Sequence, residues 1–230
     1  QNCGKTTLFN ALTGSNQHVG NFPGVTVEKK EGKVRGHEEI RIVDLPGIYS
    51  LSPYTSEEIV TRDFILNEKP DVILNIVDAT NIVRNLYLSL QLMELEKPMV
   101  IALNMMDEVT RSGNHIDVEQ LSEKLKVRVV PISAIRRDGI DDLVAALMEA
   151  AAAEAHFDLD FCSGAIHRAI HSIAHIVEDH AQQAGIPKRF AATKLVDGDA
   201  PMQQLLQLHD SDMDIIEHII RQMEKELGTD

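Results

Sequence analysis

The sequence predicts an α/β domain built on a mostly parallel sheet, followed by a small all-helical domain. Between residues 70 and 153, short apolar runs alternate with segments of helical period. That pattern is typical of parallel strands covered by helices on both faces. After about residue 156 the strand signals stop, and apolar residues recur only at helical spacing. We therefore expect a first domain over residues 1–156 and a second over residues 157–230.

The expected elements of the first domain follow from turn signals and apolar spacing. Residues 5–12 read as a helix that stops at Gly14, and residues 15–26 as a long polar loop rich in Gly and Pro. The later elements are antiparallel strands at 27–35 and 38–43, a helix at 55–67 opened by a capping box, a strand at 72–77, a helix at 83–93, a strand at 99–103, a short helix from 117, a strand at 127–132 and a helix at 139–153. For the second domain we expect helices at 162–184, 191–195 and 211–227.

Composition limits what the chain can bind. Hydrophobic residues make up 43% and charged residues 25%, as in ordinary globular proteins. The net charge of −14 argues against general binding to nucleic acid. The two cysteines, Cys3 and Cys162, are too few for a disulfide framework and fit a reducing compartment. No run approaches the roughly 18 apolar residues of a membrane span, so a membrane role would come from a neighbour in the assembly or from sequence beyond Asp230.

The chain begins inside a candidate phosphate-binding loop. Gly4-Lys5-Thr6 is the second half of the pattern G-x-x-x-x-G-K-[ST], whose first glycine would lie one residue before Gln1. A helix that starts directly after this loop presents free N–H groups and its positive dipole end to a phosphate. In α/β folds such a loop follows a buried strand, so we expect the native chain to start upstream of Gln1. The candidate phosphate-binding residues are Asn2, Cys3, Gly4, Lys5, Thr6 and Thr7.

Further polar groups are expected beside this loop, because open α/β sheets bind ligands at the carboxyl ends of their strands. Lys5 would supply a cation to the β- and γ-phosphates, and the Thr6 hydroxyl would ligate Mg²⁺. Asp44 begins the pattern D-x-x-G and would hold the same metal through water, while the Gly47 N–H would contact the γ-phosphate. Thr26 would reach the metal only when its loop folds in, which suits a switch that senses the γ-phosphate.

A third group of residues is expected to recognise a base. Asp107 offers two acceptors for the N1–H and N2–H₂ edge of guanine, and Asn104 with the Ala134 backbone would serve the other side. Met105 and Ser133 lie beside them in the sequence. Each motif alone has an ordinary explanation, such as a strand-end turn or an Asx-turn in a loop. All of them in this order predict a guanine-nucleotide-binding domain with a P-loop GTPase fold.

Four stretches resemble the ferrous-iron transport protein B (FeoB) family. They are residues 19–28, 44–51, 85–88 and 104–107, the last with Met105 where most small GTPases have lysine. The resemblance covers the whole G domain and, more weakly, the tail, which is similar to a helical domain that favours GDP binding. It implies a GTP-hydrolysing domain at the cytoplasmic face of the bacterial cell membrane, which regulates or drives Fe²⁺ uptake by a polytopic permease in the same polypeptide. It also implies small Feo accessory proteins as partners, and a homo-oligomer.

Three positions qualify what the resemblance implies. Ile48 follows D-x-x-G directly, where most small GTPases have a glutamine that orients the attacking water, so we expect slow hydrolysis. Asn2 matches a phosphate-loop asparagine that helps ligate K⁺ in related potassium-stimulated GTPases, and K⁺ stimulation is our hypothesis here. Met105 replaces a lysine whose stem packs on the base, which predicts modest, micromolar nucleotide affinity.

Two other function classes stay open. An assembly-type GTPase acting on ribosomal RNA is disfavoured by the charge of −14 and by the absence of a basic tail. The other class is a nucleotide-dependent interaction module with negligible hydrolysis. His167, His171 and His175 recur every four residues but fall on the solvent side of their helix, so a metal site is not expected there. Cys3 reads as a small residue that fits its loop.

Overall fold

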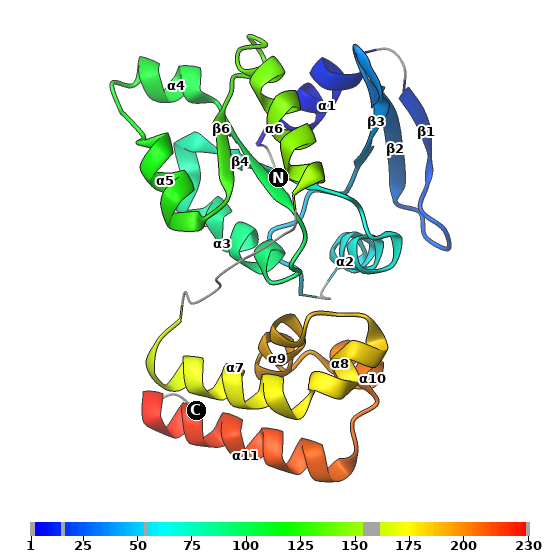
Figure 1. Ribbon diagram of the computed structural model, residues 1–230, viewed down its shortest axis with the longest axis vertical. Helices are drawn as coiled ribbons and strands as arrows, with labels where there is room; N and C mark the ends of the chain where they lie inside the picture. Colours follow the sequence, from blue (N-terminus) through cyan, green and yellow to red (C-terminus); the bar gives the residue numbers. More distant parts are fainter. Residues whose placement is uncertain (1–2, 15–16, 53–54, 154–161, 229–230) are drawn as a thin grey trace. The chain divides into compact units, whose positions relative to one another are not determined.

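The computed structural model describes residues 3–14, 17–52, 55–153 and 162–228 (Figure 1). The chain divides into two compact units, one comprising residues 1–93 and 97–157 and the other residues 94–96 and 158–230. The expected boundary between residues 156 and 157 lies outside the described residues. Among the described residues, no helix is both long and apolar enough to cross a membrane.

The first unit contains two sheets and the helices around them. Its elements are α1 (Lys5–Thr13), β1 (Gln17–Asn21), β2 (Glu28–Val34), β3 (His37–Asp44), α2 (Ser56–Glu68), β4 (Ile73–Asp78), the 3₁₀ helix η1 (Ala79–Asn81), α3 (Ile82–Met93), β5 (Met99–Asn104), α4 (Met106–Arg111), α5 (Val118–Leu125), β6 (Arg128–Pro131) and α6 (Ile140–Ala152). Strands β1, β2 and β3 pair antiparallel in that order. Strands β4, β5 and β6 form the predicted parallel sheet, with Ile73 opposite Met99 and Val100 opposite Arg128.

Strand β5 is the centre of the parallel sheet, and every one of its residues is buried. A strand covered on both faces can be apolar throughout, which explains the continuous run that the sequence shows. Leu8 and Leu12 of α1 and Leu143 of α6 join Val100 and Val130 in one hydrophobic core. Burial of these side chains is the main stabilising contribution to the unit. The core holds the beginning of α1 against the carboxyl ends of the parallel strands.

Strand β1 differs from the sequence prediction of a loop over residues 15–26. Residues 17–21 pair with residues 28–32 of β2, so the loop between the two strands is short. Four of the five β1 residues are exposed at this edge of the sheet. Burial therefore imposes no apolar alternation on the strand, and its sequence carries no period-2 signal. The Phe22 N–H donates to the Val27 carbonyl at 2.9 Å and closes the loop that carries Thr26.

The described residues of the second unit are all-helical apart from the connections between helices. Its helices are α7 (Gly164–Ile176), α8 (Glu178–Ala184), α9 (Lys188–Val196), α10 (Ala200–Leu206) and α11 (Asp210–Leu227). The single helix expected at 162–184 is two helices, interrupted at Val177 with φ −92° and ψ 4°. Helix α10 was not predicted, because seven residues give too little apolar period. Its start is capped by Asp199, which accepts a hydrogen bond from the Met202 N–H at 2.9 Å.

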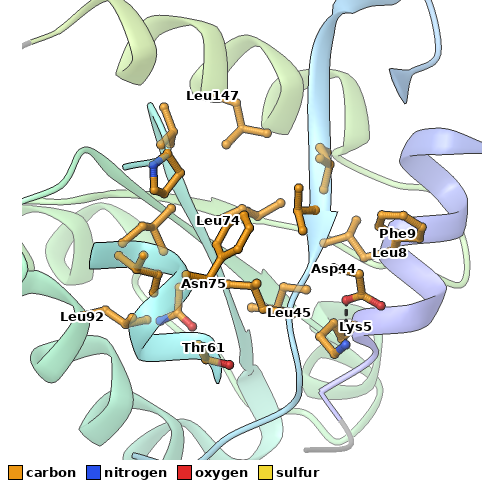
Figure 2. A pocket seen from close by; sticks show the side chains of 18 of the residues that line it. Lys5, Leu8, Phe9, Asp44, Leu45, Thr61, Leu74, Asn75, Leu92 and Leu147 are labelled. Atoms are coloured by element: carbon orange, nitrogen blue, oxygen red, sulfur yellow. Dashed lines mark hydrogen bonds and ion pairs between the residues drawn. The ribbon is translucent and has the colours of Figure 1, made fainter. Parts of the chain in front are cut away.

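A cavity of about 1350 Å³ lies between strands β3 and β4 in the first unit (Figure 2). Within the described part of the chain, β3 pairs only with β2 and β4 only with β5. Successive residues 39–44 and 73–76 of the two strands line the cavity. Because side chains alternate across a strand, a cavity that meets successive residues lies at the strand's edge. Each of these two strands thus has one edge that faces the cavity.

Candidate functional site

The turn before α1 brings the backbone close to the end of β5. Gly4 is the N-cap of α1, with φ 81° and ψ 22°, in the left-handed region that favours glycine. A Cβ atom at Gly4 would lie 2.4 Å from Nδ2 of Asn104, so a side chain would also collide. The two constraints explain why this position requires glycine.

Asn104, at the end of β5, uses both ends of its amide to hold other segments. Its Nδ2 donates to the Cys3 carbonyl at 2.8 Å, and its Oδ1 accepts from the Ala134 N–H at 2.9 Å. Cys3, Asn104 and Ala134 are all buried, so solvent competes little for these hydrogen bonds. One side chain therefore ties the start of α1 to the loop that follows β6.

Lys5 and Asp44 form an ion pair between α1 and the end of β3 (Figure 2). Nζ of Lys5 lies 2.6 Å from Oδ1 of Asp44, whose side chain is only 9% exposed. Lys5 and Asp44 line a cavity of about 230 Å³ together with Thr6. The other residues around this cavity are Val27, Glu28, Lys30, Leu45 and Pro46. A cation, a carboxylate and a hydroxyl group thus face one small space at the N-terminus of a helix.

Gly47 and Thr26 occupy different places around this cluster. Gly47 lines the larger cavity, which also reaches residues 3–7. Thr26 is exposed in the loop between β1 and β2 and lines neither of the two cavities, although its neighbour Val27 lines the smaller one. The structure therefore places Thr26 beside the cluster and not in it, and a loop movement is needed to bring its hydroxyl in.

The expected base-binding residues lie around the start of α4. Met105 is the N-cap of this helix, with φ 66°, an uncommon conformation for a residue other than glycine. Asp107 lies in the first turn, with Nη2 of Arg111 3.5 Å from its Oδ2. Ser133 and Ala134 are buried in the neighbouring loop, where the Ser133 N–H donates to the Asp138 carbonyl at 3.1 Å. Nothing in the motif signals the left-handed backbone at Met105.

The segment after Asp44 makes two contacts with α3 that the sequence analysis missed. The Leu51 N–H donates to Oε1 of Gln91 at 2.7 Å. The guanidinium of Arg84 lies 4.5 Å from the centroid of the Tyr49 ring. Arg84 and Gln91 are seven residues apart, or two helical turns, so they lie on one face of α3. Polar residues two turns apart in a mainly apolar helix are the signal that would have found them.

The capping box predicted at the start of α2 is confirmed. The Glu58 N–H donates to Thr55 Oγ1, and Oε2 of Glu58 accepts from the Thr55 N–H in return. Oε1 of Glu58 also accepts from the Ser50 hydroxyl at 3.2 Å. Glu58 therefore fixes the helix start and at the same time holds a residue of the segment after Asp44.

Two candidates from the sequence remain, namely Asn2 and the three histidines of the second unit. Asn2, the expected K⁺ ligand, lies outside the described residues. The rings of His167 and His171 lie 6.0 Å apart and those of His171 and His175 4.6 Å apart, on α7 of the second unit. In the described ranges, no three His, Cys, Asp or Glu side chains are arranged to hold a metal ion.

Comparison with protein families matches both units. Residues 1–147 match the family model for ferrous iron transport protein B, and residues 163–230 match the model for the FeoB cytosolic helical domain. The Fe(2+) transporter FeoB of Methanocaldococcus jannaschii is 40% identical over 231 residues, which cover 99% of this chain and 34% of the relative. The Fe(2+) transport protein A/Fe(2+) transporter FeoB fusion protein of Porphyromonas gingivalis is also 40% identical, over 89% of this chain and 25% of the relative. The chain thus spans about a third or less of these relatives.

Solved structures match the whole chain. A crystal structure of an S. thermophilus NFeoB mutant bound to GDP has a TM-score of 0.93 at 42% identity and covers 100% of this chain and 89% of that chain. NFeoB from S. thermophilus bound to GDP·AlF4⁻ and K⁺ has a TM-score of 0.87 at the same identity and coverage. At this level of similarity, the fold is that of a P-loop GTPase followed by a helical domain.

Proposed function

The chain belongs to the ferrous iron transport protein B family, and on that premise we propose that it binds GTP and hydrolyses it to GDP and phosphate. In this proposal, hydrolysis regulates or drives ferrous iron uptake by a membrane permease of the same polypeptide. The observation that carries the proposal is the cluster of Lys5, Thr6 and Asp44 around one cavity at the start of α1. A cation, a hydroxyl and a carboxylate at a helix N-terminus match the needs of a triphosphate with Mg²⁺.

The residues at this cavity fit Mg²⁺, which prefers oxygen ligands. The Thr6 hydroxyl and the carboxylates of Asp44 and Glu28 are oxygen donors that line it. Glu28 is paired with Lys30, and we assign Thr6 and Asp44 as the metal ligands. We infer that Thr26 adds a third oxygen after its loop closes. When bound, Mg²⁺ neutralises charge on the β- and γ-phosphate oxygens.

Lys5 must change partner for nucleotide to bind. Its ammonium group is paired with Asp44 here, and in the proposed complex it donates to the β- and γ-phosphates while Asp44 serves as a metal ligand. Replacing a partly buried ion pair offsets much of the gain from the new contacts. This exchange supports the expectation of micromolar affinity.

Guanine recognition is assigned to the loops after β5 and β6. The Asp107 carboxylate would exchange Arg111 for the N1–H and N2–H₂ groups of the base. Asn104 is held in place for the other side of the base by its two backbone hydrogen bonds. The remaining residues proposed to surround the nucleotide are Asn2, Cys3, Gly4 and Thr7 at the phosphates, Gly47 at the γ-phosphate, and Met105, Ser133 and Ala134 at the base.

Hydrolysis is proposed to be slow and stimulated by K⁺. Ile48 stands where a water-orienting glutamine is expected, and an aliphatic side chain cannot orient water. A K⁺ ion at Asn2 would add positive charge beside the phosphates, where charge develops in the transition state. The GDP·AlF4⁻ and K⁺ complex of S. thermophilus NFeoB supports the use of this ion.

The test is GTP turnover by the whole chain in KCl and in NaCl at equal ionic strength. We expect turnover to be at least about tenfold faster in KCl, since one well-placed charge is worth that much or more. Asn2→Ala should remove the difference while GDP binding persists, and Asn10→Ala, at an exposed position of α1, should retain it. Equal rates in the two salts would end the K⁺ proposal, and no turnover in either would end the GTPase proposal.

The relatives support part of the proposed location and partners. The curated relatives are Fe(2+) transporters of which this chain spans only a part, which supports a permease in the same polypeptide. We propose that the chain lies at the cytoplasmic face of the bacterial cell membrane. Small Feo accessory proteins and a second copy of the chain are further proposed partners. Nucleic acid is not among them, because the chain carries a net charge of −14.

A further inference from the structure

The segment that follows Asp44 is held at its far end by one buried side chain of α3. Residues 45–50 form neither helix nor strand, and Gly47 lies among them. Leu51, four residues after Gly47, is completely buried. Its N–H donates to Oε1 of Gln91 at 2.7 Å, and Gln91 is itself only 7% exposed.

We propose that Gln91 is a positioning residue for GTP hydrolysis. By fixing the position of Leu51, Gln91 also limits the positions that Gly47 can take. It thereby sets the point at which the Gly47 N–H contacts the γ-phosphate. This inference rests on the proposed function of the site. It extends that function to a residue of α3 that lies outside the nucleotide-binding motifs and does not touch the nucleotide.

Each group in this hydrogen bond is buried and would be costly to leave without its partner. Leu51 lies outside helices and strands, and a buried N–H without a partner is costly. Gln91 lies beside Leu92 and Met93, which are buried in the core, and a buried amide also requires a hydrogen bond. A leucine or methionine at position 91 would pack there more simply. The amide is therefore explained by its contact with the segment and not by packing.

The geometry of the segment supports a role in positioning. Its beginning is held by the pairing of β3 with β2, in which Asp44 lies opposite Lys30, and Gln91 anchors its end in the core. Between these anchors, the Tyr49 ring under Arg84 is 43% exposed, and the Ser50 hydroxyl makes a partly buried hydrogen bond to Glu58. Nucleotide-dependent movement is then confined to residues 45–50, with both ends fixed. A switch of this kind needs a fixed reference point, and a buried helix supplies one.

The experiment compares Gln91→Leu with a matched control in the same helix. Ser89 is completely buried and accepts a hydrogen bond from Nδ2 of Asn75, also at 2.7 Å. Its hydroxyl donates to the Asn85 carbonyl, so both of these partners lie outside residues 44–52. Gln91→Leu and Ser89→Ala should therefore lower the thermal midpoint by similar amounts. Only Gln91→Leu should lower kcat, by about tenfold or more, with the dissociation constant of GDP unchanged.

Gln91→Glu provides the rescue, because a carboxylate keeps an acceptor oxygen for the Leu51 N–H. Its kcat should exceed that of Gln91→Leu by at least about fivefold if the acceptor is what matters. A kcat for Gln91→Leu within twofold of wild type, or an equal loss in Ser89→Ala, would overturn the inference. Absence of turnover in the wild-type chain would instead refute the proposed function itself, so the two failures are distinguishable.

Discussion

The Asn104 side chain holds two backbone segments of this site together in the absence of a ligand. Its amide spans from the Cys3 carbonyl to the Ala134 N–H, and its Nδ2 fills the space where a Cβ of Gly4 would be. The phosphate loop and the base loop are therefore coupled through one residue. A loss of nucleotide binding on substitution of Asn104 will include the loss of this coupling.

We predict that Asn104→Ala lowers both the stability of the chain and its affinity for GDP. The change leaves the Cys3 carbonyl and the Ala134 N–H buried without partners, which should lower the free energy of unfolding by about 2–4 kcal/mol. GDP affinity should fall with it, because the two loops are no longer held together. Urea unfolding and GDP titration measure the two effects.

The control for Asn104 is Asn114→Ala, since Asn114 is exposed and its Nδ2 donates only to a neighbouring hydroxyl. It should change stability by no more than about 0.5 kcal/mol. If Asn104→Ala weakened GDP binding with stability unchanged, the residue would act on the base alone and not as a brace.

Helix α9 lies beside a buried acidic residue, Glu94. Glu94, which groups with the second unit, accepts a hydrogen bond from the Thr193 hydroxyl at 3.1 Å. Burial raises the pKa of Glu94 to about 7, although the Thr193 hydrogen bond and the charges of Arg189 and Lys194 act to lower it. Asp197 nearby adds to the increase. The other carboxylate oxygen of Glu94, Oε2, is buried without a hydrogen-bond partner in the described part of the chain.

This burial predicts a pH dependence of stability. Because the folded pKa exceeds the ordinary value of 4.5, the folded chain binds the proton more tightly, and stability falls as pH rises from about 4.5 to about 7. The full shift is worth up to about 3 kcal/mol. Glu94→Gln removes the titration and keeps an acceptor for Thr193, so it should stabilise the second unit at pH 8 and flatten the profile between pH 5 and pH 7.5.

Unfolding curves at several pH values between 5 and 8 test this prediction. Glu96→Gln is the control, because Glu96 belongs to the same short segment but is exposed. Its profile should follow the wild type. An unchanged slope in Glu94→Gln would show that another group governs the pH dependence.

In the whole molecule, the two units have separate cores and the candidate nucleotide site belongs to the first. Val100, Leu8 and Leu143 are fully buried in the first unit, and Phe190 and Ile173 in the second. We predict that the helical domain favours GDP binding, as the family resemblance implies. Linkage then requires the reverse effect, in which GDP stabilises the helical domain by the same free energy.

Amide hydrogen exchange can detect this coupling in each unit separately, and it suits a chain without tryptophan. GDP at 100 times its dissociation constant should stabilise the first unit by about 2.7 kcal/mol and slow exchange in β5 accordingly. Exchange in α7 and α11 should slow by a smaller factor, which corresponds to a coupling energy of at least about 1 kcal/mol. A non-hydrolysable GTP analogue should protect these two helices less. Unchanged exchange in α7 and α11 would exclude the coupling.

The sequence predicted the elements whose burial leaves a pattern. The strands expected at 72–77, 99–103 and 127–132 agree with β4, β5 and β6 to within about a residue at each end, because each contains a run of apolar residues. Strand β5, which is buried throughout, gives the clearest of these runs. Strand β1 was missed because its side chains are exposed, and the break at Val177 because the apolar spacing continues through it.

The site was predictable only as a set of candidates. Motifs named Lys5 and Asp44 with ligand roles, but their ion pair joins residues 39 positions apart and depends on how α1 meets β3. The contact between Gln91 and Leu51 likewise joins residues 40 positions apart. Such pairs follow from the topology of the chain and leave no local pattern in the sequence.

The cavity between β3 and β4 bears on how the protein behaves in concentrated solution. Unpaired strand edges offer rows of N–H and C=O groups that recruit strands from other molecules. On β3, Glu39 and Arg41 place charges at the opening, whereas Leu74 and Ile76 of β4 are uncharged. The net charge of −14 keeps molecules apart at low ionic strength, and added salt screens it. For this chain taken by itself, we therefore expect self-association to increase with protein concentration and with added salt.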